Sequence, residues 1–258
     1  MGLTETLSLL TVAMFAAMLI LLEAGRWLGA KRIAQDPDGA RTGIGVIEAS
    51  VFGLMGLLMA FSFSGAADRF TTRRQLIVEE ANAIGTAWLR LDLLPQAARD
   101  SVREGFRSYL DARIEAHRSA ADLQAAARHL ERGTRLQQQI WSESVKAAAE
   151  TGSPQAPMLV LPALNTMIDI TTTRLMATRT HQPAIVFIML EILTMVCAFM
   201  AGFAMAGSRS RNWIHMVAFA MLMSLIMYII MDLEYPRLGL IRVDSFDEVL
   251  MELRRSMN

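Results

Sequence analysis

Four long stretches almost free of charge constrain this chain more than any other feature of its sequence. They occupy residues 6–22, 49–67, 192–208 and 212–231, and are 17, 19, 17 and 20 residues long. A helix that crosses the hydrocarbon core of a bilayer needs about 17–25 mostly apolar residues. Inside lipid, every backbone polar group must be satisfied within its own segment. The sequence therefore predicts an integral membrane protein with four transmembrane helices.

The composition agrees with a membrane protein and argues against a nucleic-acid-binding or a disulfide-bonded protein. Hydrophobic residues make up 53% of the chain and charged residues 19%, so it is more apolar than an ordinary soluble domain. Lys and Arg together number 25, as do Asp and Glu, so no net charge favours nucleic acid as a partner. The single Cys197 excludes an intramolecular disulfide. The N-terminus lacks the features of a cleaved signal peptide, so we expect the first stretch to remain as a membrane helix.

The first two apolar stretches are predicted to form helices that end in different ways. We expect the first helix at about residues 3–22, followed by a polar connection, and the second at about residues 43–63. The second helix is predicted to continue beyond the membrane and to stop before Pro95. The evidence is an apolar seam with spacings of 4, 3, 4 and 3 residues, typical of packed helices: Ile77, Ala81, Ile84, Trp88 and Leu91.

The residues between the two pairs show helical periodicity and no period-2 strand pattern. Arg107 lies four residues before Asp111, a spacing suited to an ion pair on one helix face. Residues 151–157 contain two prolines and a glycine and predict a break between helices. One apolar row repeats every four residues: Val102, Phe106, Leu110 and Ile114.

The predicted fold class is all-α, with four transmembrane helices in two hairpins that flank an amphipathic helical bundle. We expect residues 1–65 to form the first hairpin and residues 66–181 a helical extramembrane domain that continues from the second helix. Residues 182–231 should form the second hairpin, and residues 232–258 a tail with a short helix.

Two parts of the chain resemble the bestrophin-like family of bacterial membrane proteins. They are residues 56–70 (GLLMAFSFSGAADRF) with residues 75–86 (QLIVEEANAIGT), and residues 233–242 (LEYPRLGLIR). The resemblance covers nearly the whole chain and implies the same architecture, in the bacterial plasma membrane. True bestrophins, which are more distantly similar, are pentameric ligand-gated anion channels. By analogy that likeness implies a homo-oligomer, a pentamer, that conducts small ions.

Small side chains follow one face of the second helix, where Gly53, Gly56, Ala60 and Ser64 are spaced 3, 4 and 4 residues apart. Such a row allows close helix packing, which a matching row on the third helix (Ala198, Gly202 and Ala206) favours. The alternative is that the same row lines a narrow pore. The candidate residues of an ion pathway are Gly53, Gly56, Ala60, Ser62, Phe63, Ser64 and Glu191.

Glu191 belongs to this set because it lies inside the third apolar helix. A carboxylate at membrane depth is costly and usually faces a protein interior or an aqueous path. The alternative is a protonated or snorkelling side chain near the helix end, since Glu191 is only eight residues beyond Pro183.

Polar residues also gather beyond the second and fourth membrane helices. They are candidates for an ion vestibule or a regulatory site, and the alternative is a set of solvated interface residues. The set comprises Asp68, Arg69, Arg73, Glu79, Glu80, Asn82, Asp232, Glu234, Tyr235 and Arg237.

Catalytic, metal-binding and cofactor-binding motifs are not found in the sequence. His117, His129, His181 and His215 lack the spacing of a zinc site, and neither a Walker loop nor a Rossmann glycine pattern occurs. We therefore expect neither an enzyme nor a cofactor, and as partners membrane lipid, small ions and further copies of the chain. The first hypothesis is a channel or channel-like transporter with the second helix lining the pore. The second is a non-conducting membrane sensor or scaffold whose helical domain binds a partner.

The side of the membrane on which the helical domain lies is predicted from basic residues in short loops, which tend to remain cytoplasmic. The first connection carries Arg26, Lys31, Arg32 and Arg41, and basic residues also occupy the turn between the last two helices. This places both connections inside the cell and the helical domain outside. Arginines of the helical domain and tail favour the reverse, so both topologies stay open.

Overall fold

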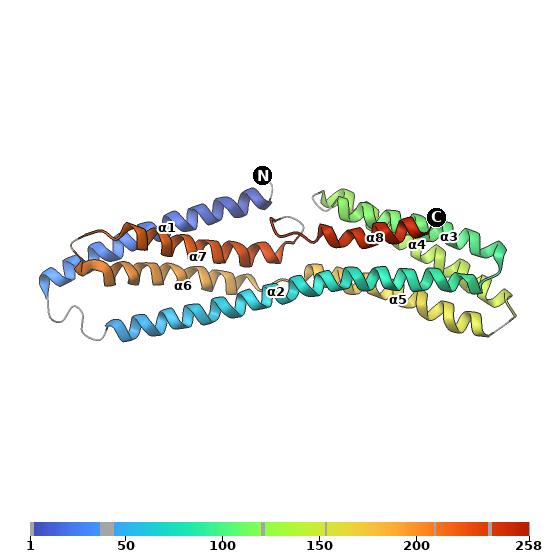
Figure 1. Cartoon of the computed structure of the whole chain (residues 1–258), viewed down its shortest axis with the longest axis horizontal. Coiled ribbons are helices and arrows are strands. Elements are labelled where there is room, and N and C mark those ends of the chain that lie inside the picture. Colours follow the sequence, from blue (N-terminus) through green and yellow to red (C-terminus); the bar gives the residue numbers. More distant parts are fainter. Residues whose placement is uncertain are drawn as a thin grey trace. The chain divides into compact units, whose positions relative to one another are not determined.

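The computed structural model describes residues 3–36, 44–119, 122–152, 154–208, 210–236 and 239–257. Within those ranges the chain forms helices and turns without a β-strand, so the all-α prediction is confirmed. Two short 3-10 turns, η2 (Leu91–Leu93) and η3 (Met205–Gly207), extend α-helices. The described residues form eight α-helices, shown in Figure 1: α1 (Leu3–Gln35), α2 (Ile44–Arg90), α3 (Gln96–Arg118), α4 (Leu123–Glu150), α5 (Gln155–Arg179), α6 (Ala184–Ala204), α7 (Trp213–Glu234) and α8 (Asp244–Ser256).

The chain divides into two compact units, each with its own hydrophobic core. The first, which we call the membrane unit, comprises Met1–Asp68 and His181–Tyr235. The second, the helical unit, comprises Arg69–Thr180 and Pro236–Asn258. α2 contributes to both, as expected from its continuous pattern. That the helical unit lies outside the bilayer stays a prediction.

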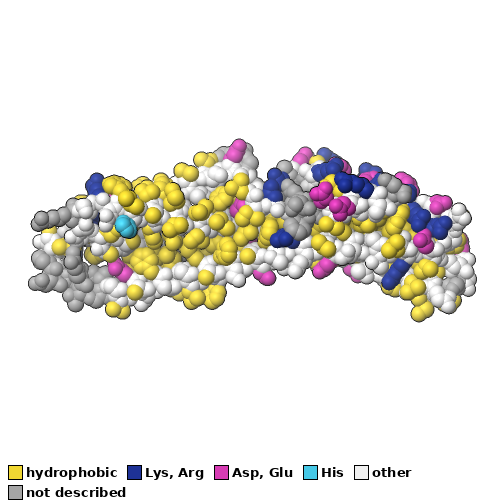
Figure 2. Space-filling view, viewed as in Figure 1, with side chains coloured by type: hydrophobic (Ala, Val, Ile, Leu, Met, Phe, Trp, Pro, Cys, Tyr) yellow, Lys and Arg dark blue, Asp and Glu magenta, His cyan; other side chains and the backbone are white. Residues whose placement is uncertain are grey.

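The membrane unit contains the four predicted transmembrane helices, within α1, α2, α6 and α7. Four helical stretches of the described chain are long and apolar enough to cross a membrane. Large apolar side chains such as Val12, Ile20 and Ile185 are more than 60% exposed. Hydrophobic side chains cover the visible face of this unit in Figure 2, whereas charged side chains gather over the helical unit. This distribution suits a surface that meets lipid.

α1 is longer than the sequence predicted, because it continues to Gln35 instead of ending near residue 22. Residues 23–35 contain no proline, and the two glycines among them lie on a packed face. A Cβ at Gly25 would overlap the carbonyl oxygen of Phe199, and one at Gly29 would lie 2.8 Å from that of Phe203. Both partners belong to α6, so these glycines serve close helix packing rather than helix termination.

The helical unit is a bundle in which α3 packs on α4, α4 on α5, and α8 on α3. α2 ends at Arg90, and Pro95 precedes α3, as predicted. The predicted ion pair between Arg107 and Asp111 is wrong. Arg107 bonds to Glu104, and Asp111 accepts a hydrogen bond of 2.8 Å from Nε of Arg254. Packing of α8 against α3 supplies that partner, which spacing along α3 alone does not reveal.

Candidate functional site

The membrane part of α2 has one face buried in its own unit. Met55, Met59, Ser62 and Ala66 are buried and spaced 4, 3 and 4 residues apart. At about 100° per residue this spacing keeps them on one side of the helix. Phe52 extends the contact by meeting Phe219 of α7 edge-on, with ring centroids 6.1 Å apart.

The small-residue row lies away from this buried face. Gly53, Gly56, Ala60 and Ser64 are all exposed. A Cβ at Gly53 or Gly56 would meet nothing within 4 Å. The row therefore takes no part in packing within the chain.

The predicted pairing of small rows between the second and third membrane helices is wrong. A Cβ at Gly202 of α6 would overlap the backbone of Leu22 in α1, and the Cβ of Ala206, in the η3 turn that extends α6, lies beside Gly29 of α1. The close partner of α6 is thus α1, which leaves the small face of α2 open.

Bulky apolar residues form a second exposed row on α2. Leu54, Leu57 and Phe61 are 50%, 52% and 65% exposed, and each stands one residue after a member of the small row. One residue corresponds to about 100° of rotation, so the two rows are distinct. The exposed surface of α2 is therefore small on one side and bulky on the other.

The two remaining candidates on α2, Ser62 and Phe63, differ in exposure. Phe63 is 45% exposed. Ser62 is buried, and its Oγ accepts a hydrogen bond of 3.0 Å from Nε2 of Gln182. The hydroxyl of Ser62 therefore joins α2 to the segment before α6 and does not share the small face.

Glu191 is exposed on α6, between the exposed residues Ile188 and Ile192. Its side chain forms no hydrogen bond or ion pair with any described residue. The carboxylate therefore does not fill a packed four-helix core.

The end of α7 carries buried acids. Asp232 and Glu234 are 0% and 1% exposed. Nδ1 of His181 lies 3.3 Å from Oε2 of Glu234, and the His181 ring stacks on Tyr235 with centroids 4.9 Å apart. His181 was not among the predicted site residues, because 53 positions separate it from Glu234. Asp68 is exposed in the same unit, and Arg237 lies outside the described residues.

In the helical unit, Glu80 is fully buried between two arginines. Its Oε1 accepts a hydrogen bond of 2.6 Å from Nε of Arg113, and its Oε2 accepts one from Nη1 of Arg174. Neither arginine was predicted as a site residue. One signal was available for Arg113, since it lies seven residues after Phe106 and so shares the apolar face of α3.

The other predicted residues of the helical unit are separate from this cluster. Arg73 is buried and donates to the carbonyl oxygens of Ala177 and Thr180, at 3.1 and 2.8 Å, where α5 ends. Basic groups suit this position because the last carbonyls of a helix lack partners. Arg69 is half-buried, whereas Glu79 and Asn82 are exposed. Across the described ranges, no group of three or more His, Cys, Asp or Glu residues is placed to hold a metal ion.

Four apolar helices in two pairs, separated by a helical bundle, define an all-α integral membrane protein. The family model of the Bestrophin-like domain matches residues 7–245, and the chain belongs to the bestrophin-like family. The membership indicated by the residue motifs is confirmed. No curated protein matches the chain.

Solved structures share the fold at low sequence identity. A bacterial Bestrophin homolog from Klebsiella pneumoniae, solved by Zn-SAD phasing, is 16% identical with a TM-score of 0.69, and the match covers 93% of this chain and 97% of that one. A point-mutated form of that homolog is 12% identical with a TM-score of 0.71 and coverages of 95% and 98%. A structure described only as a membrane protein is 15% identical with a TM-score of 0.72 and coverages of 94% and 95%. These likenesses support the fold.

Proposed function

We propose that the chain assembles as a homo-oligomeric channel for small ions in the bacterial plasma membrane, with the small face of α2 lining the pore. Gly53, Gly56, Ala60 and Ser64 supply this face, and Phe63 lies at its margin. The observation that carries the proposal is that the face is open in the single chain, where a Cβ at Gly53 or Gly56 would meet no atom.

The interior of the membrane unit favours a pore between chains over one within a chain. Met18, Leu22, Leu190, Cys197 and Ala198 are all 0% exposed and form one continuous core. Such packing leaves the ion path to the junction of several subunits. A pentamer follows from the distant likeness to true bestrophins and is part of this proposal.

The two exposed rows of α2 suit different surroundings in such an oligomer. Leu54, Leu57 and Phe61 present bulky apolar groups of the kind that meet lipid or a neighbouring subunit. The small row instead offers a hydroxyl at Ser64 and close access to backbone dipoles, which polar pores use to replace water around an ion.

The exposure of Glu191 supports a water-filled path or a contact with a neighbouring subunit at this position of α6. In a single chain its carboxylate is exposed among apolar side chains, and contact with lipid would be costly. We infer that Glu191 faces water or a neighbouring subunit and belongs to the ion pathway. No catalytic step enters this function.

The predicted vestibule is retained as a proposal for the exposed residues. Asp68, Glu79 and Asn82 are accessible to a passing ion. Arg69, Tyr235 and the buried Asp232 stay in the proposed regulatory set, whereas the buried groups Arg73, Glu80 and Glu234 act through the contacts described above.

Flux measurements test the pore directly. The purified protein in liposomes should pass chloride or potassium. Ala60→Phe should reduce that flux at least about tenfold, because a ring on the small face narrows the path. The control Leu57→Phe places the same aromatic ring in the neighbouring row, which is already bulky, and should leave flux close to that of the unchanged protein.

If the liposomes pass neither chloride nor potassium at any tested pH or voltage, the channel proposal is overturned and the non-conducting sensor or scaffold is favoured. Equal loss of flux in both variants would remove the small face from the pore. Native mass spectrometry in mild detergent should show an oligomer, and a monomer would count against a pore between chains.

A further inference from the structure

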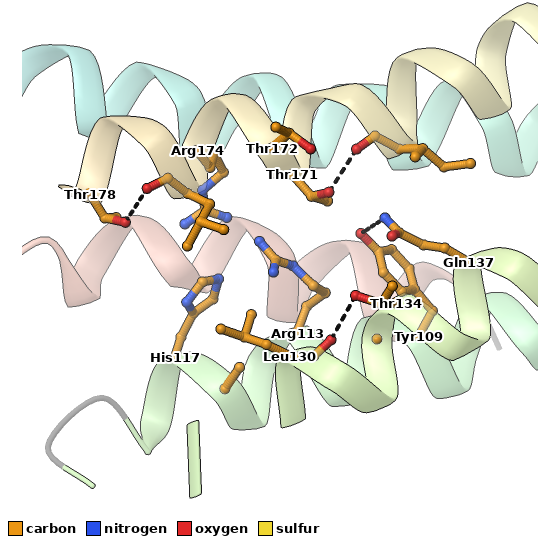
Figure 3. A pocket seen from close by; sticks show the side chains of 14 residues that line it. Tyr109, Arg113, His117, Leu130, Thr134, Gln137, Thr171, Thr172, Arg174 and Thr178 are labelled. Atoms are coloured by element: carbon orange, nitrogen blue, oxygen red, sulfur yellow. Dashed lines mark hydrogen bonds between the residues drawn. The ribbon is translucent and has the colours of Figure 1, made fainter. Parts of the chain in front are cut away.

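A cavity of about 370 Å³ lies within the helical unit, among α3, α4 and α5. Figure 3 shows Arg113 and Arg174 reaching into it from facing helices. Its volume falls in the range of small-molecule sites. Its polar lining includes Arg113, His117, Thr134, Gln137, Thr172 and Arg174. No described residue that lines it carries a carboxylate.

Two buried arginines share one carboxylate at this cavity. Arg113 and Arg174 are 7% and 6% exposed, and both bond to the single carboxylate of Glu80. Arg113 uses only its Nε in that bond, so the rest of its guanidinium group still presents positive charge and donors to the cavity. Burying a charged group away from water is costly, so this guanidinium favours a bound anion.

Several hydrogen-bond donors at the cavity are unused. Arg113 donates through Nε to Glu80, and its terminal nitrogens have no partner among the described residues. The hydroxyl of Thr172 likewise has none. The oxygen of Tyr109 accepts a hydrogen bond of 3.1 Å from Gln137, which leaves its own proton available. Burial raises the pKa of Tyr109, so this phenol stays protonated at neutral pH.

We propose that this cavity binds a small anionic molecule through a carboxylate or phosphate group. The terminal nitrogens of Arg113 hold the oxyanion, because a guanidinium matches its geometry with two parallel hydrogen bonds. Thr172 supplies a further donor. Leu130, Ile168 and Leu175 line the same cavity and accommodate the apolar part of the ligand. The site is independent of the pore, so absence of ion flux would leave it unaffected.

Binding is tested on the full-length protein in detergent with two probes, inorganic phosphate and succinate. Calorimetric titration should show saturable binding of at least one of them. The melting temperature should rise with its concentration, because a ligand of the folded state stabilises it by mass action. Chloride at the same ionic strength is the control and should give a smaller shift. No saturable binding of either probe, or an equal shift with chloride, would overturn the proposal.

Variants locate the site. Arg113→Lys keeps the charge but loses the paired donors, and should lower the affinity for the bound probe about tenfold or more. Thr172→Val should lower the same affinity about fivefold. Thr173→Val is the matched control, since Thr173 bonds to the carbonyl oxygen of Asp169 and does not line the cavity. If Arg113→Lys does not fold, the threonine pair decides the question. Equal affinities of the two threonine variants would refute the assignment.

Discussion

Glu80 of α2 and Arg113 of α3 form a hydrogen-bonded ion pair in which both side chains are buried, with 2.6 Å between Oε1 and Nε. The residues are 33 positions apart, so the pair ties α2 to the helix that follows it. Arg174 brings α5 to the same carboxylate. Three helices of the helical unit therefore share one buried charge cluster.

Glu80→Ala should destabilise the protein strongly, because two buried guanidinium groups would lose their counter-charge. Breaking such a cluster costs about 3–5 kcal/mol, which thermal or denaturant unfolding in detergent would measure. Glu79→Ala changes an exposed neighbour on the same turn and should stay within about 0.5 kcal/mol of the unchanged protein. Similar stabilities of the two variants would show that the buried cluster contributes little.

Gly202→Ala should destabilise the membrane unit, since the new Cβ would overlap the backbone of Leu22 and force α1 and α6 apart. Overpacking of this kind costs about 1–3 kcal/mol. Gly56→Ala places the same methyl group in open space and should cost nothing, because alanine favours a helix over glycine. Melting temperatures of the two variants in one detergent provide the comparison. The packing assignment fails if Gly56→Ala is the more damaging change.

Glu191→Gln should alter ion flux or its pH dependence while leaving folding intact. The carboxylate forms no contact with described residues, so its neutral analogue removes charge from the surface without disturbing the core. Vesicle flux between pH 5 and pH 8, with the melting temperature as a folding control, tests this. Normal flux and an unchanged pH response would remove Glu191 from the ion pathway.

Asp122 should stabilise α4 in a pH-dependent manner. Its Oδ1 accepts hydrogen bonds from the backbone N–H groups of Gln124 and Ala125 at the start of the helix, and the bond from Ala125 is the main reason that the pKa of Asp122 is lowered. The stabilisation is present above the unfolded-state pKa and is lost as pH falls through the folded-state pKa. Asp122→Ala should lower the melting temperature at pH 7, and this difference should shrink at pH 3. Asp122→Asn keeps a cap and should lose less.

The orientation of the chain can be read by cysteine labelling of intact cells. In a Cys197→Ala background, Ser119→Cys should react with an impermeant reagent if the helical unit lies outside the cell. Asp38→Cys, in the first connection, should then stay protected. The opposite pattern would invert the topology.

The membrane helices could be predicted from sequence because the hydrocarbon thickness imposes their length and apolar character. The continuation of α2 toward Pro95 followed from local periodicity in the same way. Neither the length of an apolar stretch nor its local periodicity predicts contacts between residues that are far apart in the sequence. Asp111 pairs with Arg254, and Gly25 and Gly29 pack against α6. Small residues at a helix end and small residues at a contact look alike in one dimension, and only the partner distinguishes them.

Arg113 shows a different limit of sequence reasoning. From sequence alone, an arginine within an apolar row is predicted to be exposed to solvent. Its burial can be predicted only if the buried acid that pairs with it is known. In the sequence, Glu80 is only one member of a polar run that also contains the exposed Glu79. The two acids are adjacent in sequence and differ in exposure because a helix turns about 100° between them.

The packing of the membrane unit also determines which of its helices can move. α1 and α6 touch backbone to backbone at Gly25 and Gly202, so neither can shift without collision. α2 is instead attached by side chains, among them Met55 and Met59, whose unbranched thioether side chains adapt to displaced neighbours by changing rotamers. A rotation of α2 would thus require new side-chain torsions and release of the hydrogen bond from Gln182 to Ser62, but no displacement of backbone against backbone at Gly53 or Gly56. Mechanical freedom in the described part of the membrane unit is therefore greater for α2, which enters both cores, than for α1 and α6.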